Sequence, residues 1–253
     1  MKVEKFLKRI GFSGTPKVDY YTLAQLQTKF LLSVPFENLD MHYCDGVAFG
    51  IEAAYDKIVE RNRGGYCYEC NSLMYAMLCE MGFRVDIYSG RMTIDGPLDG
   101  PEFGHMFLKV TIDRDYLVDV GNGQSFRTPL YEDGGNEAWI PEGFWFRVGP
   151  HIDGRTLYSR SADTRWNTRF NYDPIARDIN QFRGGRDYHH TSPDSPFTKG
   201  PLATLATPEG RIFVTPNRFV ENRFGEKTET TLNSEAEFLE CLKTRFNLIP
   251  DSK

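Results

Sequence analysis

The first third of the chain has apolar residues at the spacing of an amphipathic helix. Thr22, followed three residues later by Gln25, matches a capping box, in which two side chains satisfy the first free N–H groups of a helix. The apolar face that follows consists of Leu23, Leu26 and Phe30. Pro35 disfavours helical backbone at the residue before it. The sequence therefore predicts a helix that begins near Thr22 and ends before Pro35.

Two further helices are predicted before residue 83. The first covers about residues 52–61, and the Gly64-Gly65 pair closes it. The second covers about residues 67–81, where apolar residues again recur at helical spacing, and it stops at Gly82.

After Gly82 the apolar residues follow a period of two, which is typical of β-strands. Residues 107–112 and 116–120 are predicted as strands, and the polar segment 113–115 joins them as a hairpin turn. Residues 145–148 are another strand candidate. The middle third is therefore expected to be mostly β.

The last third is predicted to contain a connector, two strands and a terminal helix. Residues 183–200 are rich in Gly, Pro, Ser and Asp, which indicates a loop. Residues 202–206 and 211–215 are predicted strands on either side of a turn. Ser234 and Glu237 form a capping box for a final helix. Its buried stripe is predicted to be Phe238, Leu242 and Phe246. Helices followed by strands and then a mixed segment indicate an α+β fold rather than repeating βαβ units.

Composition narrows the classes of partner and compartment. The 253 residues carry a formal net charge of −5, and nucleic-acid binding needs a basic face, so nucleic acid is not an expected partner. We interpret the arginine-rich stretch 160–169 as a solvated surface, because Asp163 and Trp166 interrupt it. No apolar run approaches the ~20 residues of a membrane helix, and the N-terminus lacks a signal-peptide core. We therefore expect a soluble, cytoplasmic protein without a membrane partner. The five cysteines are an odd number, which argues against a disulfide framework.

Cys67 is the strongest candidate for chemistry. It follows the Gly64-Gly65 pair at the predicted start of a helix, where free N–H groups and the positive helix end favour a thiolate. The same N–H groups are suited to hold the oxyanion of a tetrahedral intermediate. A thiolate nucleophile needs a base, and the base needs an orienting partner. His105 opens an apolar strand and Asp119 lies within the next, so Cys67, His105 and Asp119 are a candidate triad.

The predicted hairpin does not bring the two triad partners together by itself. A symmetric turn at Arg114 pairs positions whose numbers sum to about 228, which leaves His105 and Asp119 about four residues, or roughly 13 Å, out of register. Either the strand bends or His105 lies in the loop before it.

Other interpretations of Cys67 stay open on the residues alone. A cysteine is often simply a small buried residue of the core. The spacing Cys67-x-x-Cys70 also occurs in zinc and redox modules, but no second pair of ligands with similar spacing follows, and no βαβ context precedes it. A thiol hydrolase or amidase would use the same triad with water as acceptor. We expect no metal.

Several segments together resemble the arylamine N-acetyltransferases. Residues 63–71 resemble the RGGxCxExN signature of that family, and residues 34–39 resemble its upstream PFENL segment. The segments around His105 and Asp119 resemble those that supply the triad histidine and aspartate, and the segment 207–210 resembles part of the family's third domain. The matches occur in the family's order, from about residue 34 to residue 210.

The resemblance implies a three-part fold with a cysteine-protease-like catalytic core. The parts are an N-terminal helical bundle (1–82) with the nucleophile, a central β-barrel (83–185) with His105 and Asp119, and a C-terminal α/β lid (186–253). It also implies ping-pong transfer, in which acetyl-CoA acetylates Cys67 and an arylamine or arylhydrazine then takes the acetyl group. Acetyl-CoA is the acyl donor, and both partners are small molecules.

The resemblance also suggests roles for side chains around the triad. Structural support of the site is expected from Arg63, Glu37 and Asn71. Substrate contacts are expected from Phe36, Phe126 and Phe197. The chain departs from the family at Asn122, where an aromatic residue is usual, and this change bears on acceptor preference. Because the segment 100–104 is acidic, the family's contacts with the phosphates of coenzyme A cannot be assigned to it by resemblance. The natural acceptor, the acyl-chain preference and the oligomeric state do not follow from the sequence.

Overall fold

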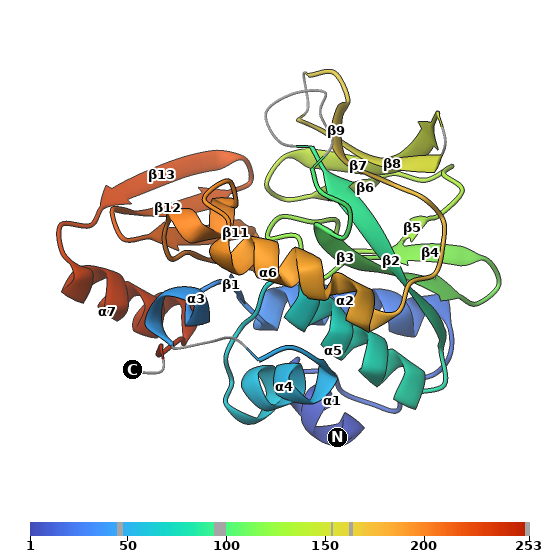
Figure 1. Ribbon diagram of the computed structural model, residues 1–253, viewed down its shortest axis with the longest axis horizontal. Coiled ribbons are helices and arrows are strands. Elements are labelled where there is room, and N and C mark those ends of the chain that lie inside the picture. The colour runs from blue at the N-terminus through green and yellow to red at the C-terminus, as the bar shows by residue number, and fades with distance from the viewer. Residues whose placement is uncertain (45–47, 94–99, 153, 162–163, 251–253) are drawn as a thin grey trace.

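The computed structural model describes residues 1–44, 48–93, 100–152, 154–161 and 164–250. In the view of Figure 1, most helices form a layer at the base, with a large sheet above it and a smaller sheet beside it. The helices are α1 (Val3–Arg9), α2 (Tyr20–Ser33), α3 (Asp40–Tyr43), α4 (Ile51–Tyr55), the π-helical turn η1 (Asp56–Glu60), α5 (Cys67–Glu80), the 3₁₀ turn η2 (Ile179–Phe182), α6 (Arg183–Thr191), the 3₁₀ turn η3 (Pro196–Lys199) and α7 (Glu235–Phe246).

The strands form two antiparallel sheets. The larger, barrel-like sheet has the order β5-β4-β3-β2-β9-β8-β7-β6, and the smaller has the order β1-β10-β11-β12-β13. The strands are β1 (Phe36–Glu37), β2 (Arg84–Met92), β3 (His105–Thr111), β4 (Asp115–Val118), β5 (Leu130–Tyr131), β6 (Ala138–Ile140), β7 (Phe144–His151), β8 (Gly154–Ser161), β9 (Asn167–Tyr172), β10 (Ala203–Thr207), β11 (Gly210–Thr215), β12 (Arg218–Arg223) and β13 (Glu226–Thr231). This architecture confirms the predicted α+β class.

The small sheet joins the two ends of the chain. Phe36 and Glu37 of β1 pair with Thr204 and Ala203 of β10, so a segment between two N-terminal helices becomes an edge strand of the C-terminal sheet. This pairing brings Phe36 beside η3, which carries Phe197, and their ring centroids lie 6.0 Å apart.

α5 is the central helix of the fold. Eleven of its fourteen residues are buried. A surface helix buries only one stripe of its residues, so α5 is packed on nearly all sides. It packs against α4, β2 and β3. Its first residue, Cys67, therefore begins in the interior rather than at the surface.

One of the two predicted helix starts is corrected. α2 begins at Tyr20, and its N-cap is Asp19, whose Oδ1 accepts a hydrogen bond from Thr22 N at 2.7 Å. Thr22 is buried in the first turn and is not the N-cap, because the carboxylate three residues earlier already takes that N–H. For α7 the N-cap is confirmed, since Ser234 Oγ accepts from Glu237 N at 3.2 Å, but the reciprocal half of the capping box is not, because Glu237 Oε2 accepts from Asn233 N at 2.9 Å rather than from Ser234 N.

The predicted loop 183–200 is wrong, because the segment contains α6 and η3. Figure 1 shows α6 crossing in front of α5. A Cβ at Gly185 would lie 2.3 Å from Phe103 O and 2.6 Å from Tyr68 Oη. The glycine therefore serves close packing of the helix rather than a turn, and composition alone does not distinguish the two uses.

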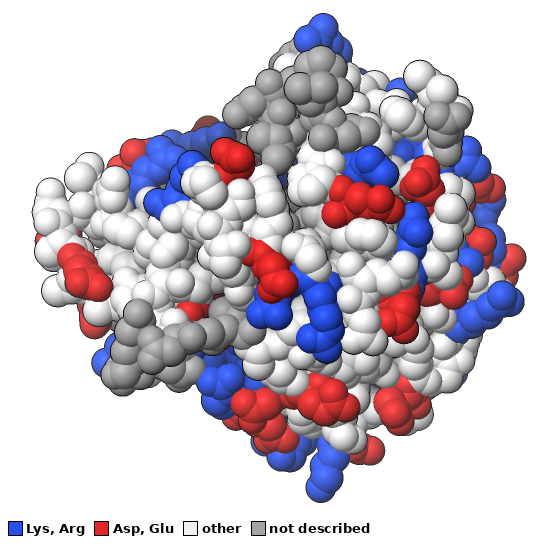
Figure 2. All heavy atoms as spheres, in the orientation of Figure 1, with Lys and Arg blue, Asp and Glu red and all other residues white. Residues whose placement is uncertain are grey.

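The surface carries charges of both signs. On the face shown in Figure 2, basic and acidic side chains are interspersed over both sheets and the helical layer. Among the described residues, no helix is both long enough and apolar enough to cross a membrane. The division of the chain into three domains stays a prediction; its last boundary, at 185/186, falls inside α6.

Candidate active site

The Gly64-Gly65 pair brings Cys67 to the start of α5 through a close backbone approach. A Cβ at Gly64 would lie 2.2 Å from Pro35 O, and one at Gly65 would lie 2.8 Å from Glu69 Cβ. The two segments are also bonded, because Gly65 N donates to Pro35 O and Glu37 N donates to Gly65 O, each at 3.1 Å. Only glycine fits both positions, so the pair anchors the nucleophile's helix to β1.

His105 and Asp119 are in direct contact. His105 Nε2 lies 2.9 Å from Asp119 Oδ2, and both side chains are buried. The hairpin explains how they meet. β3 and β4 pair Leu108 with Val118, so the position opposite His105 along the same line would be Gly121, two residues from Asp119. That offset is about 7 Å at strand rise, and the side chains of His105 and Asp119 bridge it.

The ladder between the two strands also ends before the triad. Its last pair is Leu108 with Val118, and His105 instead pairs with Gly90 of β2. Asp119 is thus the first residue beyond β4, where the backbone is free to turn toward His105. The sequence left two alternatives: a bent strand, or His105 in the loop before its strand. His105 is the first residue of β3, and the chain bends where β4 ends, at Asp119.

The charges of the site support one another. Burial alone lowers the pKa of His105, but Asp119 and the hydrogen-bonding side chain of Cys67 raise it to about 10. Burial alone raises the pKa of Asp119, but His105, Gly121 N and Asn71 hold it below its ordinary value. At neutral pH the imidazole is therefore protonated, and it is hydrogen-bonded to the side chain of Cys67.

Asn71 and Gly121 hold the aspartate segment against α5. Asn71 Nδ2 donates to Asp119 Oδ1 at 3.1 Å and to Met106 O at 2.6 Å, while its Oδ1 accepts from Val120 N at 3.1 Å. A Cβ at Gly121 would lie 2.6 Å from Cys67 Cα, so the two backbones nearly touch. This contact sets the spacing between the nucleophile and the strand end that carries Asp119.

A buried ion cluster supports the helix start from below. Arg63 Nη2 lies 2.6 Å from Asp40 and 3.2 Å from Glu37, as the expected supporting role of Arg63 and Glu37 requires. Lys57, which the sequence analysis missed, lies 2.9 Å from Asp40, 3.4 Å from Glu37 and 3.0 Å from Glu69. Glu69 Oε2 in turn accepts from the N–H of residue 66, one position before Cys67. The sequence does contain a signal for Lys57, because a lysine on the apolar face of the helix predicted at about residues 52–61 needs a buried partner.

A cavity of about 400 Å³ opens onto the triad. Its lining comprises Phe36, Cys67, Met92, Thr93, Pro101, Gly104, His105, Gly121, Asn122, Arg169, Tyr188, His189, Pro196 and Phe197. Phe36 and Phe197 therefore lie where the resemblance expects them. Phe126 does not: it is fully buried in the barrel core, with its ring centroid 6.1 Å from that of Phe146. It follows Asn122 by four residues, and the chain has by then turned into the core.

Comparisons with known proteins agree on one family. A sequence model described as N-acetyltransferase matches residues 19–252. Human arylamine N-acetyltransferase 1 is 32% identical over 98% of this chain and 94% of its own length. The arylamine N-acetyltransferase of Mycolicibacterium smegmatis is 33% identical over 98% and 92%.

The chain belongs to the arylamine N-acetyltransferase family.

Solved structures of the family share the fold. The enzyme from Mycobacterium tuberculosis superposes with a TM-score of 0.86 at 30% identity, covering 97% of this chain and 93% of that one. The Mycobacterium marinum enzyme in complex with CoA gives a TM-score of 0.86 at 28% identity, with 97% and 92% covered. The predicted family is thereby confirmed, and this chain is an acyltransferase enzyme.

Two groups of this N-acetyltransferase's cavity were not expected from the sequence. Arg169 of β9 lines it. The interpretation of residues 160–169 as a solvated surface is therefore wrong for Arg169, because strand alternation turns its side chain toward the cavity. His189 of α6 lies in the segment predicted as loop, and its Nε2 lies 2.8 Å from Gly104 O, next to His105. Its burial lowers its pKa, so it is neutral at pH 7.

Cys70 faces away from the cavity of this family member. It is buried, its Sγ donates to Gly65 O at 3.2 Å, and burial raises the pKa of its thiol well above the ordinary value. Such a thiol is a poor redox partner for Cys67. Within the described part of the chain, no group of three or more His, Cys, Asp or Glu side chains is arranged to hold a metal ion.

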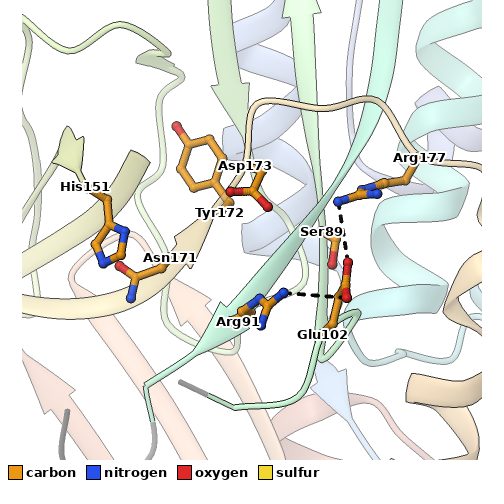
Figure 3. Close-up of a pocket in the computed structure, with 8 residues that line it drawn as sticks. All are labelled: Ser89, Arg91, Glu102, His151, Asn171, Tyr172, Asp173 and Arg177. Atoms are coloured by element: carbon orange, nitrogen blue, oxygen red, sulfur yellow. Dashed lines mark hydrogen bonds and ion pairs between the residues drawn. The ribbon is translucent and has the colours of Figure 1, made fainter. Parts of the chain in front are cut away.

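A second, polar pocket of about 280 Å³ lies beside β2 and β9, and none of its lining residues lines the Cys67 cavity. Figure 3 shows Glu102 between two guanidinium groups, Arg91 and Arg177, each 3.5 Å away. The acidic segment before His105 is thus neutralised locally by arginines from β2 and from the chain beyond β9.

Proposed function

We propose that this enzyme transfers an acetyl group from acetyl-CoA to the nitrogen of arylamines and arylhydrazines by a ping-pong reaction through a thioester on Cys67. The observation that carries the proposal is that Cys67 and His105 line one cavity, while the buried Asp119 is bonded to His105. Its similarity to arylamine N-acetyltransferases, one of which, from Mycobacterium marinum, has been solved in complex with CoA, supports the donor and acceptor classes.

In the first half-reaction, the Cys67 thiolate attacks the carbonyl carbon of acetyl-CoA. The new carbon–sulfur bond gives a tetrahedral oxyanion, for which the free N–H groups at the start of α5 are suitable donors. The bond to the coenzyme A sulfur then breaks, and the protonated His105 gives its proton to that sulfur. Acetyl-Cys67, neutral His105 and coenzyme A result.

In the second half-reaction, the amine nitrogen attacks the thioester carbon. His105 takes the proton from the nitrogen as the bond to Cys67 breaks, so the thiolate and the imidazolium return together. Asp119 orients the imidazole in both steps and stabilises its charge. Arg63, Glu37 and Asn71 act as positioning residues that hold this arrangement.

The acceptor is proposed to lie against an aromatic wall. Phe36 and Phe197 both line the cavity and pack against each other with ring centroids 6.0 Å apart, and their exposed ring surface suits contact with an aryl ring. Asn38 positions Phe197, because its Nδ2 donates to Phe197 O at 2.9 Å. We do not assign a substrate contact to Phe126.

We also propose the three-part organisation and a cytoplasmic site of action. The helical bundle would supply Cys67, the barrel His105 and Asp119, and the C-terminal part the wall at Phe197. The five cysteines form no disulfide bond in the described part of the chain, which supports a reducing compartment. The interspersed charges of Figure 2 favour small-molecule partners over nucleic acid or a membrane surface.

Intact-protein mass spectrometry tests the function. After mixing with acetyl-CoA we expect one acetyl group, which is lost when an arylamine is added. Cys67→Ala should abolish the adduct, whereas Cys70→Ala, three residues along the same helix, should keep it. If no adduct formed on Cys67, the proposal would be refuted. An adduct that water removes as fast as an arylamine does would favour the thiol hydrolase instead.

A further inference from the structure

Arg169 is a partly buried cation without a carboxylate partner among the described residues, and its Nε is buried with no hydrogen-bond partner among them. Its Nη2 makes only two long contacts, 3.5 Å to Asn122 Oδ1 and 3.4 Å to Gln124 O. Burial lowers the pKa of Arg169, as expected for a guanidinium that has lost water without gaining an ion pair. An unpaired buried charge is costly, and it faces the cavity.

Asp119 is the carboxylate whose charge acts on Arg169, but its oxygens are already engaged. Oδ2 accepts from His105 at 2.9 Å. Oδ1 accepts from Asn71 Nδ2 at 3.1 Å and from Gly121 N at 2.9 Å. Asp119 therefore acts on Arg169 only at longer range.

Asn122 adds a second unused donor beside Arg169. Its Oδ1 takes the contact from Arg169, which orients the amide, because the opposite orientation would set donor against donor. Its Nδ2 is buried and has no hydrogen-bond partner within the described part of the chain. Thr93 Oγ1 is likewise buried without a hydrogen-bond partner in the described part of the chain. The N–H of Thr93 donates to Arg169 O at 3.0 Å. All three residues line the cavity of Cys67.

Buried donors without acceptors are rare in folded proteins and call for an explanation. Here a cation and an amide N–H converge on one wall, while Phe36 and Phe197 form an apolar wall of the same cavity. An aromatic ring with an anionic substituent matches both walls. A carboxylate has enough acceptor sites to take hydrogen bonds from Arg169 and Asn122 together.

We propose that Arg169 and Asn122 form an anion-binding subsite of the acceptor cavity, so that the enzyme prefers arylamines with a carboxylate on the ring. This inference rests on the proposed function and adds the acceptor's substituent to it. Asn122 stands where the family usually has an aromatic residue, and its amide supplies the donor that an aromatic side chain would lack.

The test uses acetyl-enzyme prepared with acetyl-CoA and freed of coenzyme A. Its deacetylation is followed with 3- or 4-aminobenzoate, whichever reacts faster, and with the methyl ester of the same isomer. The ratio of the two second-order rate constants measures the preference for the carboxylate. We expect a ratio well above one for the unchanged enzyme. Arg169→Gln should lower the ratio about 10- to 100-fold, as for a lost hydrogen-bonded charge pair.

Two further variants give independent readings. Asn122→Asp, nearly isosteric, places a carboxylate beside Arg169 and should abolish or reverse the preference even if Arg169→Gln does not fold. Arg169→Lys should recover part of the ratio because it keeps the charge. Arg165→Gln, the same change at an exposed arginine outside the cavity, should leave the ratio at the value of the unchanged enzyme.

The outcomes separate this inference from the proposed function. Absence of acetyl-enzyme refutes the function itself. Normal acetylation and amine turnover with a ratio near one, or equal losses for acid and ester in both variants, overturn only the subsite. A defect confined to acetylation by acetyl-CoA would assign the donors to the acyl donor instead, and would also overturn it.

Discussion

Replacement of Gly121 by Ala should impair catalysis by moving the nucleophile. The added Cβ would lie 2.6 Å from both Cys67 Cα and Asn71 Nδ2, whereas ordinary contact begins at about 3.4 Å. The segments must therefore separate by about 0.8 Å, and the Cα of a buried helix cannot rotate away as a side chain could. A misplacement of about 1 Å in an active site costs about 100-fold in rate.

The assay is the rate of Cys67 acetylation by acetyl-CoA, measured by rapid quenching and intact mass. We expect Gly121→Ala to be about 100-fold slower and about 1–3 kcal/mol less stable to urea, the usual cost of overpacking. Gly184→Ala is the matched control, because a Cβ there meets nothing within 4 Å and the residue lies in α6. The control should acetylate normally and be about 0.5–1 kcal/mol more stable.

The result that refutes this reasoning is a Gly121→Ala enzyme that folds and acetylates within about threefold of the unchanged rate. The close approach to Cys67 would then be easily relaxed, and the spacing between α5 and the end of β4 would not control the nucleophile's position. A loss of stability with an unchanged rate would have the same meaning.

Two other predictions concern the charges of the site. With the pKa of His105 raised to about 10, the imidazolium persists far above neutrality. Acetylation of Cys67 uses the proton of this imidazolium, so its rate should not fall with the pKa of a free imidazole, about 6.5; intact-mass measurements from pH 6 to 9 check this, and a decline centred near pH 6.5 would contradict the raised pKa of His105. Lys57→Met leaves buried carboxylates uncompensated and should cost about 3–5 kcal/mol in urea unfolding. Lys5→Met, which breaks an exposed pair, should cost less than about 1 kcal/mol, and equal costs would contradict the importance of burial.

The nucleophile was predictable because its signals are local. A glycine pair, a helix start and Cys67 lie within four positions, and the helix, the family and the acyltransfer chemistry were all predicted from that stretch and its matching segments. The comparisons confirm the family. The roles of the individual side chains stay predictions that the experiments above test.

Errors arose where one residue type serves two physical purposes. Gly185 resembles a loop former, yet it allows α6 to pack against Phe103. Arg169 stands among exposed charges, yet strand alternation turns it into the cavity. Phe126 follows the segment of Asp119 closely, yet it packs in the barrel core. In each case the deciding partner is distant in sequence.

The sequence by itself determined the α+β class and the segments that mark the family, and it predicted Cys67, His105 and Asp119 as a triad, because periodicity and short motifs are properties of neighbouring residues. Only the tertiary structure decided how Asp119 reaches His105, which depends on where the β3–β4 ladder ends. It also decided that Arg169 and Asn122 share a wall with Cys67. Burial and unpaired hydrogen bonds depend on all the chain segments that meet at a point, so no window of sequence contains them.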